Sequence, residues 1–293
     1  MQIISTAIET QSACRALRRA GKLLGLVPTM GALHAGHLSL VKVSKATCDI
    51  TAASIFVNPT QFGPHEDLAM YPRTFEADCA LLQAEGVDLV FAPSVDEMYP
   101  AGASTWVEVE GEGGRLEGAS RPGHLRGVAT VVSKLFHIVA PTHAFFGQKD
   151  AAQLAILRKM VRDLRFDLQI VGCPIVREPD GLAMSSRNRY LSPEERRQSL
   201  VLSRALRAAS DLVAAGEISS AMLLAAMHEA MAREPGARID YLAVVDPDTL
   251  LPIEDITSGG MLAVAAYFGT TRLLDNALTA QIIRSDQSKR LLK

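Results

Sequence analysis

The chain has 293 residues, of which 48% are apolar and 21% charged, enough for two domains with buried cores. Its 30 basic and 32 acidic side chains leave a formal charge of −2, which gives no support to broad electrostatic binding of nucleic acid or anionic lipid. The four cysteines form no C-x-x-C pair, the amino-terminal segment is unlike a secretion signal, and no apolar run reaches the length of a membrane span. We therefore expect a cytoplasmic protein with reduced thiols and no membrane or nucleic-acid partner.

The first part of the chain alternates short apolar runs with helical periods. Strands are predicted at 22–27, 50–57, 87–91, 142–146 and 166–172. Helices are predicted from the segment after the first strand through about residue 46, and at 74–85, 128–139 and 151–164. Because helices separate the strands, the connections are crossovers and the sheet is predicted to be parallel and doubly wound.

The pattern changes near residue 180. A polar, turn-rich segment leads to Ser192 and Pro193, which together with two following glutamates mark a helix start. Helices are predicted at 193–215 and 219–232, and strands near 238–245 and 261–268. We therefore predict two α/β domains: residues 1–178 with the parallel sheet, and a smaller mixed α+β domain over residues 179–293.

Polar residues directly follow three of the predicted strands. They are His34 and His37, Asn58 and Gln61, and Gly147, Lys149 and Asp150. In an open parallel sheet, ligands bind beyond the carboxyl ends of the strands. The three groups together therefore favour one binding site at this edge of the sheet.

The stretch PTMGALHAGHLSL (28–40) places His34 and His37 three residues apart at a predicted helix start. Both rings can then face one ligand, and the free N–H groups of the first turn favour a phosphate. Gly36 leaves room for close approach of a nucleotide. The alternative is a capped helix with solvated histidines. No metal is assigned, because no third ligand has a suitable spacing and the glutamate of H-E-x-x-H is missing.

Other polar residues admit both a functional and an ordinary structural interpretation. Lys149 is either a point charge for a phosphate, oriented by Asp150, or one half of a loop ion pair. Gln153 either turns toward the same edge or is solvated. His124 and Arg126 precede a predicted helix, and both interpretations stay open for them.

The segment GLAMSSRNRYL (181–191) combines two hydroxyls with Arg187, which suits triphosphate oxygens, although a serine-rich hinge has the same composition. Gln61 can donate and accept, which suits a substrate hydroxyl or carboxylate. The sequence has no G-x-x-x-x-G-K-[ST] loop, and no G-x-G-x-x-G opens the first helix. A nucleotide would therefore bind through a motif other than these two.

HAGH resembles the HIGH signature of the nucleotidyltransferase superfamily, and MSSRN resembles its mobile KMSKS-like loop. Within that superfamily the chain resembles the pantoate–β-alanine ligase family. The resemblance runs in order through VPTMGALHAGHLSL, SIFVNPTQF, EDLAMYPRT, RPGHLRGVATVVSKLF, FFGQKDAAQLAILRKMV, PIVREPDGLAMSSRNRYL and GTTRLLDN. It implies a Rossmann-like domain with a smaller domain over the site, a homodimer, and ATP-dependent condensation of pantoate with β-alanine through a pantoyl-adenylate, releasing AMP and diphosphate.

The resemblance also implies which residues act. ATP is expected at Met30, Gly31, Ala32, Leu33, His34, Ala35, Gly36, His37, Gly147, Gln148, Lys149, Asp150, Val176, Met184, Ser185, Ser186 and Arg187. Gln61 and Gln153 would hold pantoate, and Gln61 would also contact β-alanine. The catalytic donors to the phosphate oxygens would be His37, His34, Lys149 and Arg187. Mg²⁺ is expected with ATP, without assigned protein ligands, and no tightly bound organic cofactor is expected.

The sequence departs from the family pattern at three places. Gln148 stands where glutamate is common, Ala151 and Ala152 stand where an aromatic residue and glutamine are common, and Thr60 replaces a methionine beside Gln61. The first two departures could alter rates or pocket shape, and Thr60 the fit of pantoate.

Two rival functions predict other features. An adenylyltransferase with a phosphorylated acceptor suits the uncharged Gln61 and Gln153 less well than a small polyol acid does. A nucleotide- or RNA-binding module would need a basic face, which the near-neutral charge argues against.

Overall fold

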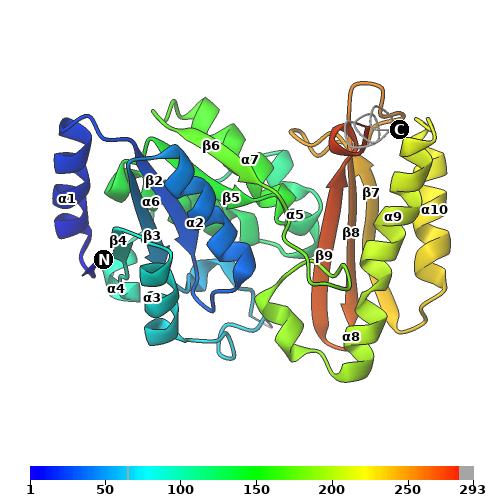
Figure 1. Cartoon of the computed structure of the whole chain (residues 1–293), viewed down its shortest axis with the longest axis horizontal. Helices are drawn as coiled ribbons and strands as arrows, with labels where there is room; N and C mark the ends of the chain where they lie inside the picture. Colours follow the sequence, from blue (N-terminus) through cyan, green and yellow to red (C-terminus); the bar gives the residue numbers. More distant parts are fainter. Residues whose placement is uncertain (65, 284–293) are drawn as a thin grey trace. The chain divides into compact units, whose positions relative to one another are not determined.

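A computed structural model describes residues 1–64 and 66–283 of the chain (Figure 1). By its internal contacts the chain divides into two compact units. Unit 1 comprises Met1–Gln148 and Ala152–Pro174, and unit 2 comprises Lys149–Ala151 and the described residues from Ile175 onward. The domain boundary after residue 178 stays a prediction.

Unit 1 is built on a parallel sheet. Its strands are β1 (Gln2–Ile4), β2 (Leu24–Thr29), β3 (Ile50–Ile55), β4 (Leu89–Phe91), β5 (His143–Gly147) and β6 (Gln169–Cys173). Within the described residues these six strands lie in the order β1-β4-β3-β2-β5-β6, and every neighbouring pair is parallel. The predicted doubly wound sheet is therefore confirmed. β1 was not predicted, because three residues are too few to display a period.

Helices connect the strands of unit 1. They are α1 (Ala7–Arg19), α2 (Ala35–Thr47), α3 (Phe75–Ala84), α4 (Val95–Met98), α5 (Glu117–Ser120), α6 (His124–Val139) and α7 (Ala151–Asp163), with the short 3₁₀ turns η1 (Pro59–Gln61) and η2 (Glu112–Gly114). The sequence did not predict α1, because it buries only Thr10 and Cys14 and so lacks a clear apolar stripe.

The order of the sheet places the predicted site. The chain passes from β2 through β3 to β4 on one side, and β5 and β6 are then added on the other side of β2. The strand order therefore reverses between β2 and β5, the topological switch point at which open α/β sheets bind ligands. β3, β2 and β5 are neighbours, so the polar segments that follow them begin at one edge of the sheet.

Unit 2 contains a small antiparallel sheet with helices. The strands β7 (Ala237–Val245), β8 (Met261–Phe268) and β9 (Thr271–Leu278) lie in that order. The helices are α8 (Pro193–Ser199), α9 (Val201–Ala214) and α10 (Ser220–Ala232), preceded by the 3₁₀ turn η3 (Ser186–Tyr190). This confirms the predicted mixed α+β fold. The helix predicted at 193–215 is divided at Leu200, and β9 was not predicted because polar residues interrupt its apolar run.

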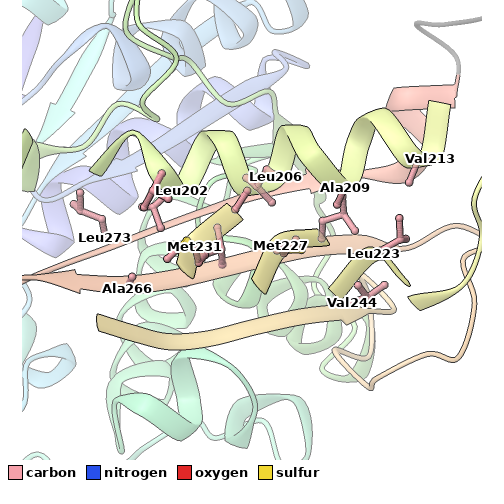
Figure 2. Close-up of a cluster of buried hydrophobic side chains, with 14 of the residues drawn as sticks. Leu202, Leu206, Ala209, Val213, Leu223, Met227, Met231, Val244, Ala266 and Leu273 are labelled. Carbon is pink, nitrogen blue, oxygen red and sulfur yellow. The ribbon is translucent and has the colours of Figure 1, made fainter. Parts of the chain in front are cut away.

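The core of unit 2 lies between its helices and its sheet (Figure 2). The buried side chains labelled there are Leu202, Leu206, Ala209 and Val213 of α9, Leu223, Met227 and Met231 of α10, Val244 of β7, Ala266 of β8 and Leu273 of β9. The apolar positions of α9 recur every three or four residues, which places them on one helical face. Among the described residues of either unit, no helix is both long and apolar enough to cross a bilayer.

Candidate active site

Residues 30–37, which join β2 to α2 and include the first turn of α2, are called the histidine loop below. It turns sharply, because Gly31 and Ala32 are both left-handed, with φ of 81° and 51°. An alanine rarely adopts this conformation and is held there only by its surroundings. The carboxylate of Asp78 provides the hold: it accepts the N–H of Ala32 at 2.9 Å and of Leu33 at 2.8 Å.

Asp78 reaches the histidine loop from α3 and is only 2% exposed. It also accepts a hydrogen bond from the Thr74 hydroxyl at 3.1 Å. A Cβ on Gly31 would lie 2.9 Å from Asp78 Oδ2, so the loop and the carboxylate are fitted tightly together. Asp78 is not among the site residues predicted from the sequence. The available signal was an acidic residue four positions before the buried Leu82, on the apolar face of the predicted helix.

His34 and His37 are brought together at the start of α2. His34 is the residue that caps the helix, and its Nδ1 accepts the N–H of Gly36 at 3.1 Å. The N–H of His34 in turn donates to Nδ1 of His37 at 3.4 Å, and the two ring centroids are 4.1 Å apart. Because both Nδ1 atoms accept, each neutral ring carries its hydrogen on Nε2. The helix is capped as the structural alternative proposed, and the caps also fix the tautomers.

Gln61 lies in η1, after β3, and its side chain is oriented by two neighbours. Its Oε1 accepts a hydrogen bond from Asn58 Nδ2 at 3.1 Å, and its Nε2 lies 2.9 Å from Met30 Sδ. Met30 begins the histidine loop, so the structure joins a predicted ATP residue to a predicted pantoate residue. Gln153 is partly buried in the first turn of α7, and no hydrogen bond joins it to Gln61 among the described residues.

The main-chain carbonyl of Gln61 is also fixed. His124 Nδ1 donates to it at 2.8 Å and Arg121 Nη2 at 3.4 Å. Arg121 forms an ion pair with Glu66. Burial acts to raise the pKa of Glu66, but hydrogen bonding and charge from Arg121 outweigh it and the pKa is lowered. His124 thus supports Gln61, whereas Arg126 lies over the Trp106 ring, 4.7 Å from its centroid.

Gly127 seats η1 against α6. A Cβ there would lie 2.3 Å from the carbonyl oxygen of Thr60 and 2.8 Å from Cα of Gln61, so only glycine permits this backbone approach. Asn58 Nδ2, which donates to Gln61 Oε1, also donates to the main-chain carbonyl of Gly127 at 3.2 Å. The position of Gln61 therefore depends on Gly127, a residue not predicted from the sequence to belong to the site.

Thr60, the departure beside Gln61, joins a small hydroxyl network. Its Oγ1 donates to Asn58 Oδ1 at 2.9 Å and lies 3.2 Å from the Tyr99 hydroxyl. Tyr99 also donates to Asn58 Oδ1, at 2.9 Å. Burial raises the pKa of Tyr99 above its ordinary value, which further favours the protonated phenol that donates. Asn58 is 1% exposed, and these two bonds fix its amide so that Nδ2 faces Gln61.

The remaining predicted residues are divided between the units. Gly147 ends β5 and Gln148 follows it in unit 1, where the Gln148 N–H donates to the Cys173 carbonyl at 2.8 Å. In unit 2, Lys149 Nζ lies 3.6 Å from Asp150 Oδ1, so the predicted ion pair is present. Among the described residues there is no cluster of three or more His, Cys, Asp or Glu side chains suited to a metal ion.

Residues 184–187 of unit 2 are called the arginine loop below. The Met184 N–H donates to the Val176 carbonyl at 2.9 Å, which brings two predicted ATP residues together. Ser185 caps η3 by accepting the N–H of Arg187 at 3.3 Å. Asn188 Nδ2 then donates to the Ala183 carbonyl at 3.1 Å and to a Glu178 carboxylate at 2.7 Å. The loop is therefore fixed at both ends.

Comparison with known proteins identifies relatives over nearly the whole chain. The family model described as pantoate-beta-alanine ligase matches residues 2–278. Pantothenate synthetase of Acidobacterium capsulatum is 69% identical over 258 residues, covering 88% of this chain and 86% of that protein. Pantothenate synthetase of Koribacter versatilis is 58% identical, covering 94% and 95%.

Solved structures agree with these relatives. Pantothenate synthetase from Thermus thermophilus superposes with a TM-score of 0.89 at 50% identity, covering 95% of this chain and 99% of that one. Pantoate-beta-alanine ligase from Francisella tularensis, solved with beta-gamma ATP and beta-alanine, gives a TM-score of 0.79 at 32% identity, covering 96% and 98%.

Proposed function

This chain belongs to the pantoate–β-alanine ligase family, and from that membership we propose how its own residues carry out the family's reaction. The reaction is an ATP-dependent condensation of pantoate with β-alanine to pantothenate by way of a pantoyl-adenylate. AMP and diphosphate are the other products. The observation that supports our assignment of roles is the paired histidine cap at the start of α2.

Two displacements make up the reaction. First, a carboxylate oxygen of pantoate attacks the α-phosphorus of ATP, and the bond from that phosphorus to the diphosphate oxygen breaks. Next, the amine of β-alanine attacks the carbonyl carbon of the adenylate, AMP leaves with the electron pair of the broken bond, and the nitrogen loses a proton to solvent. Negative charge accumulates on phosphate oxygens in the first step, so catalysis depends on positioned donors.

We assign His37 and His34 as donors for that charge. Both Nδ1 atoms accept backbone N–H groups, so in each neutral ring Nε2 is the nitrogen that donates. The N-terminus of α2 adds its positive dipole at the same place, which favours a bound phosphate. The histidine loop would then bind ATP along residues 30–37, with Gly147 and Gln148 across the switch point.

We propose that Gln61 and Gln153 bind pantoate and that Gln61 also contacts β-alanine. Support comes from the fixed amide of Gln61: Asn58 donates to its Oε1, which leaves Nε2 as the donating end. Such a group can serve a carboxylate or a hydroxyl of the substrate. Thr60 acts through Asn58, so its effect on pantoate binding is indirect.

Residues of unit 2 complete the proposed ATP contacts. They are Lys149, Asp150, Val176, Met184, Ser185, Ser186 and Arg187, which we assign on the family resemblance. Lys149 and Arg187 supply positive charge to the phosphates, and Val176 lies beside the adenine. We propose that the smaller domain closes over the bound nucleotide.

The remaining proposals concern the ion, the assembly and the compartment. We propose that Mg²⁺ arrives bound to the ATP phosphates, because these oxygens are ligands that the ion prefers. On the family resemblance we propose a cytoplasmic homodimer that needs no tightly bound organic cofactor. Light scattering of the purified full chain measures the assembly directly.

The test is AMP formation from Mg·ATP and pantoate, with and without β-alanine. We expect AMP release to depend on β-alanine and to fall by about 100-fold or more in His37→Ala, as when a transition-state donor is removed. His228→Ala, an exposed histidine of α10, is the matched control and should keep full activity. AMP release independent of β-alanine would indicate a different acceptor, and an active His37→Ala variant would exclude the role assigned to His37.

A further inference from the structure

The block GTTRLLDN at 269–276 has no role in the function proposed above, yet it contains two unusual residues. Asp275 and Asn276 are consecutive on β9, so their side chains point to opposite faces of the strand. Both are nevertheless buried, at 2% and 3% exposure, although β9 lies at the edge of its described sheet. Buried polar side chains need partners, and the partners of these two are informative.

Asp275 holds the segment that leads into the arginine loop. Its carboxylate accepts hydrogen bonds from both terminal nitrogens of Arg177, at 2.5 and 3.0 Å. Arg177 Nη1 also donates to the Gly181 carbonyl at 3.0 Å, and Arg177 pairs with Ala183 in an antiparallel bridge. The turn between Arg177 and Ala183 is thereby fixed to β9, and Met184 follows it directly.

Asn276 holds the other predicted ATP segment of unit 2. Its Nδ2 donates to the main-chain carbonyl of Lys149 at 2.9 Å. The charge of Lys149 also acts on Asp275: burial raises the pKa of Asp275, whereas Arg177 and Lys149 oppose the rise. Adjacent residues of one strand therefore contact two segments that are distant in the sequence.

We propose that Asp275 and Asn276 are positioning residues that hold Lys149 and the arginine loop in one fixed arrangement for ATP. The inference rests on the proposed function, because it takes both segments as nucleotide contacts. β9 pairs along its whole length with β8, so the two residues stand on a rigid element rather than a loop. Neither side chain needs to touch ATP. Each acts by fixing the main chain from which a donor extends.

The sheet of unit 2 provides a matched control. Asp240 of β7 accepts hydrogen bonds from Arg272 of β9, at 3.0 Å from Nε and 2.6 Å from Nη2. Like Asp275–Arg177, this is a two-point ion pair anchored on β9, and both of its side chains are less than one-fifth exposed. The pair joins two strands of one sheet, so Asp240→Asn perturbs that sheet while leaving in place the bonds that hold Lys149 and the turn after Arg177.

The experiment compares Asn276→Ala and Asp240→Asn by steady-state kinetics with each substrate varied in turn. For Asn276→Ala we expect the KM for ATP to rise about tenfold, the effect of one well-placed hydrogen bond. The KM values for pantoate and β-alanine should change less than twofold, and so should all constants of Asp240→Asn. An unchanged KM for ATP, or an equal rise in the control, would overturn the proposal.

Asp275→Asn leaves Arg177 without its carboxylate and could unfold unit 2, so it is paired with Asp275→Asn/Arg177→Met, which removes both charges. We expect the double variant to recover the thermal midpoint but to keep a raised KM for ATP. Recovery of both together would mean that the pair is merely structural and would overturn the role of Asp275. If the wild type forms no pantothenate, the proposed function fails. If it forms pantothenate and the KM for ATP is unchanged in Asn276→Ala and in the Asp275→Asn/Arg177→Met variant, only this inference fails.

Discussion

The histidine loop and the arginine loop are both predicted to contact phosphate, yet two of the contacts that support them differ in kind. In unit 1, one buried carboxylate, Asp78, binds the backbone N–H groups of the histidine loop. In unit 2, the segments beside the arginine loop are held through charged side chains, including Arg196, which contacts Glu178 and Asp180 at 2.7 Å each. The Asp78 support is buried and made to the main chain, whereas the Arg196 pairs of unit 2 are partly solvated and made between side chains.

This difference indicates how each loop responds to change. A carboxylate that accepts two consecutive backbone N–H groups restricts the turn to one conformation. If the carboxylate is removed, those N–H groups have no other acceptor among the described residues. Charged pairs near the surface exchange readily with water and are weakened by salt. We therefore expect the Asp78 contacts to be more costly to remove than the Arg196 pairs.

Removal of the buried carboxylate should have the largest effect. Asp78→Ala leaves the N–H groups of Ala32 and Leu33 without their acceptor, and each buried unsatisfied donor costs about 1–3 kcal/mol. We expect the free energy of unfolding in urea to fall by about 3 kcal/mol or more. Glu76→Ala, an exposed carboxylate of the same helix, should change it by less than about 0.5 kcal/mol. Equal losses in the two variants would contradict the anchoring role.

Crowding the turn should have an intermediate effect. Gly31→Ala and Gly21→Ala each place an alanine in a left-handed conformation, at φ of 81° and 76°, which costs about 1–2 kcal/mol. At Gly31 the new Cβ would also meet Asp78 at 2.9 Å, whereas nothing lies within 4 Å of a Cβ at Gly21. We expect Gly31→Ala to lose about 1 kcal/mol more than Gly21→Ala in the same denaturation measurement. Equal losses of unfolding free energy in the two variants would show that the turn moves away from Asp78 at little cost, against this prediction.

Removal of a solvated ion pair should have the smallest effect. Arg196→Met deletes the contacts to Glu178 and Asp180, whose side chains are 28% and 43% exposed. We expect a loss below about 1 kcal/mol, because water and side-chain entropy offset such pairs. In about 1 M salt the loss of unfolding free energy should be smaller still, because charges are then screened over about 3 Å. A large loss of unfolding free energy that does not depend on salt would show that the Arg196 pairs contribute as much as the buried Asp78 contacts, which contradicts the comparison.

Most of the fold could be predicted from the sequence because its elements carry strong periods. The strands β2, β3, β4 and β5 of the parallel sheet are mostly buried and appear as apolar runs, and their spacing by helices determines the topology. β9 was missed because Asp275 and Asn276 make it look like a loop, and only their tertiary partners explain why they are buried. Elements stabilised by long-range polar contacts leave no local pattern.

Less of the candidate site than of the fold could be predicted, and the roles of its residues stay predictions. Histidines at a helix start, and glutamine after a strand, are visible because residue type and position coincide. Asp78, Gly127 and Arg121 act on the backbone or through another residue, so their sequence neighbourhoods resemble those of ordinary helical positions. His124 could be noticed but not assigned, since its partner Gln61 is distant in the sequence.

The close seat of η1 on α6 has a consequence for redesign of the substrate site. Because Gly127 meets the main chain of Thr60 and Gln61 rather than their side chains, it sets where those residues stand without restricting which residues they are. A library aimed at other hydroxy acids can therefore vary position 61 without shifting its main chain, whereas position 60 should keep a hydroxyl that bonds to Asn58. It should leave position 127 untouched, since any side chain there displaces the whole segment and makes every variant look inactive for the same reason.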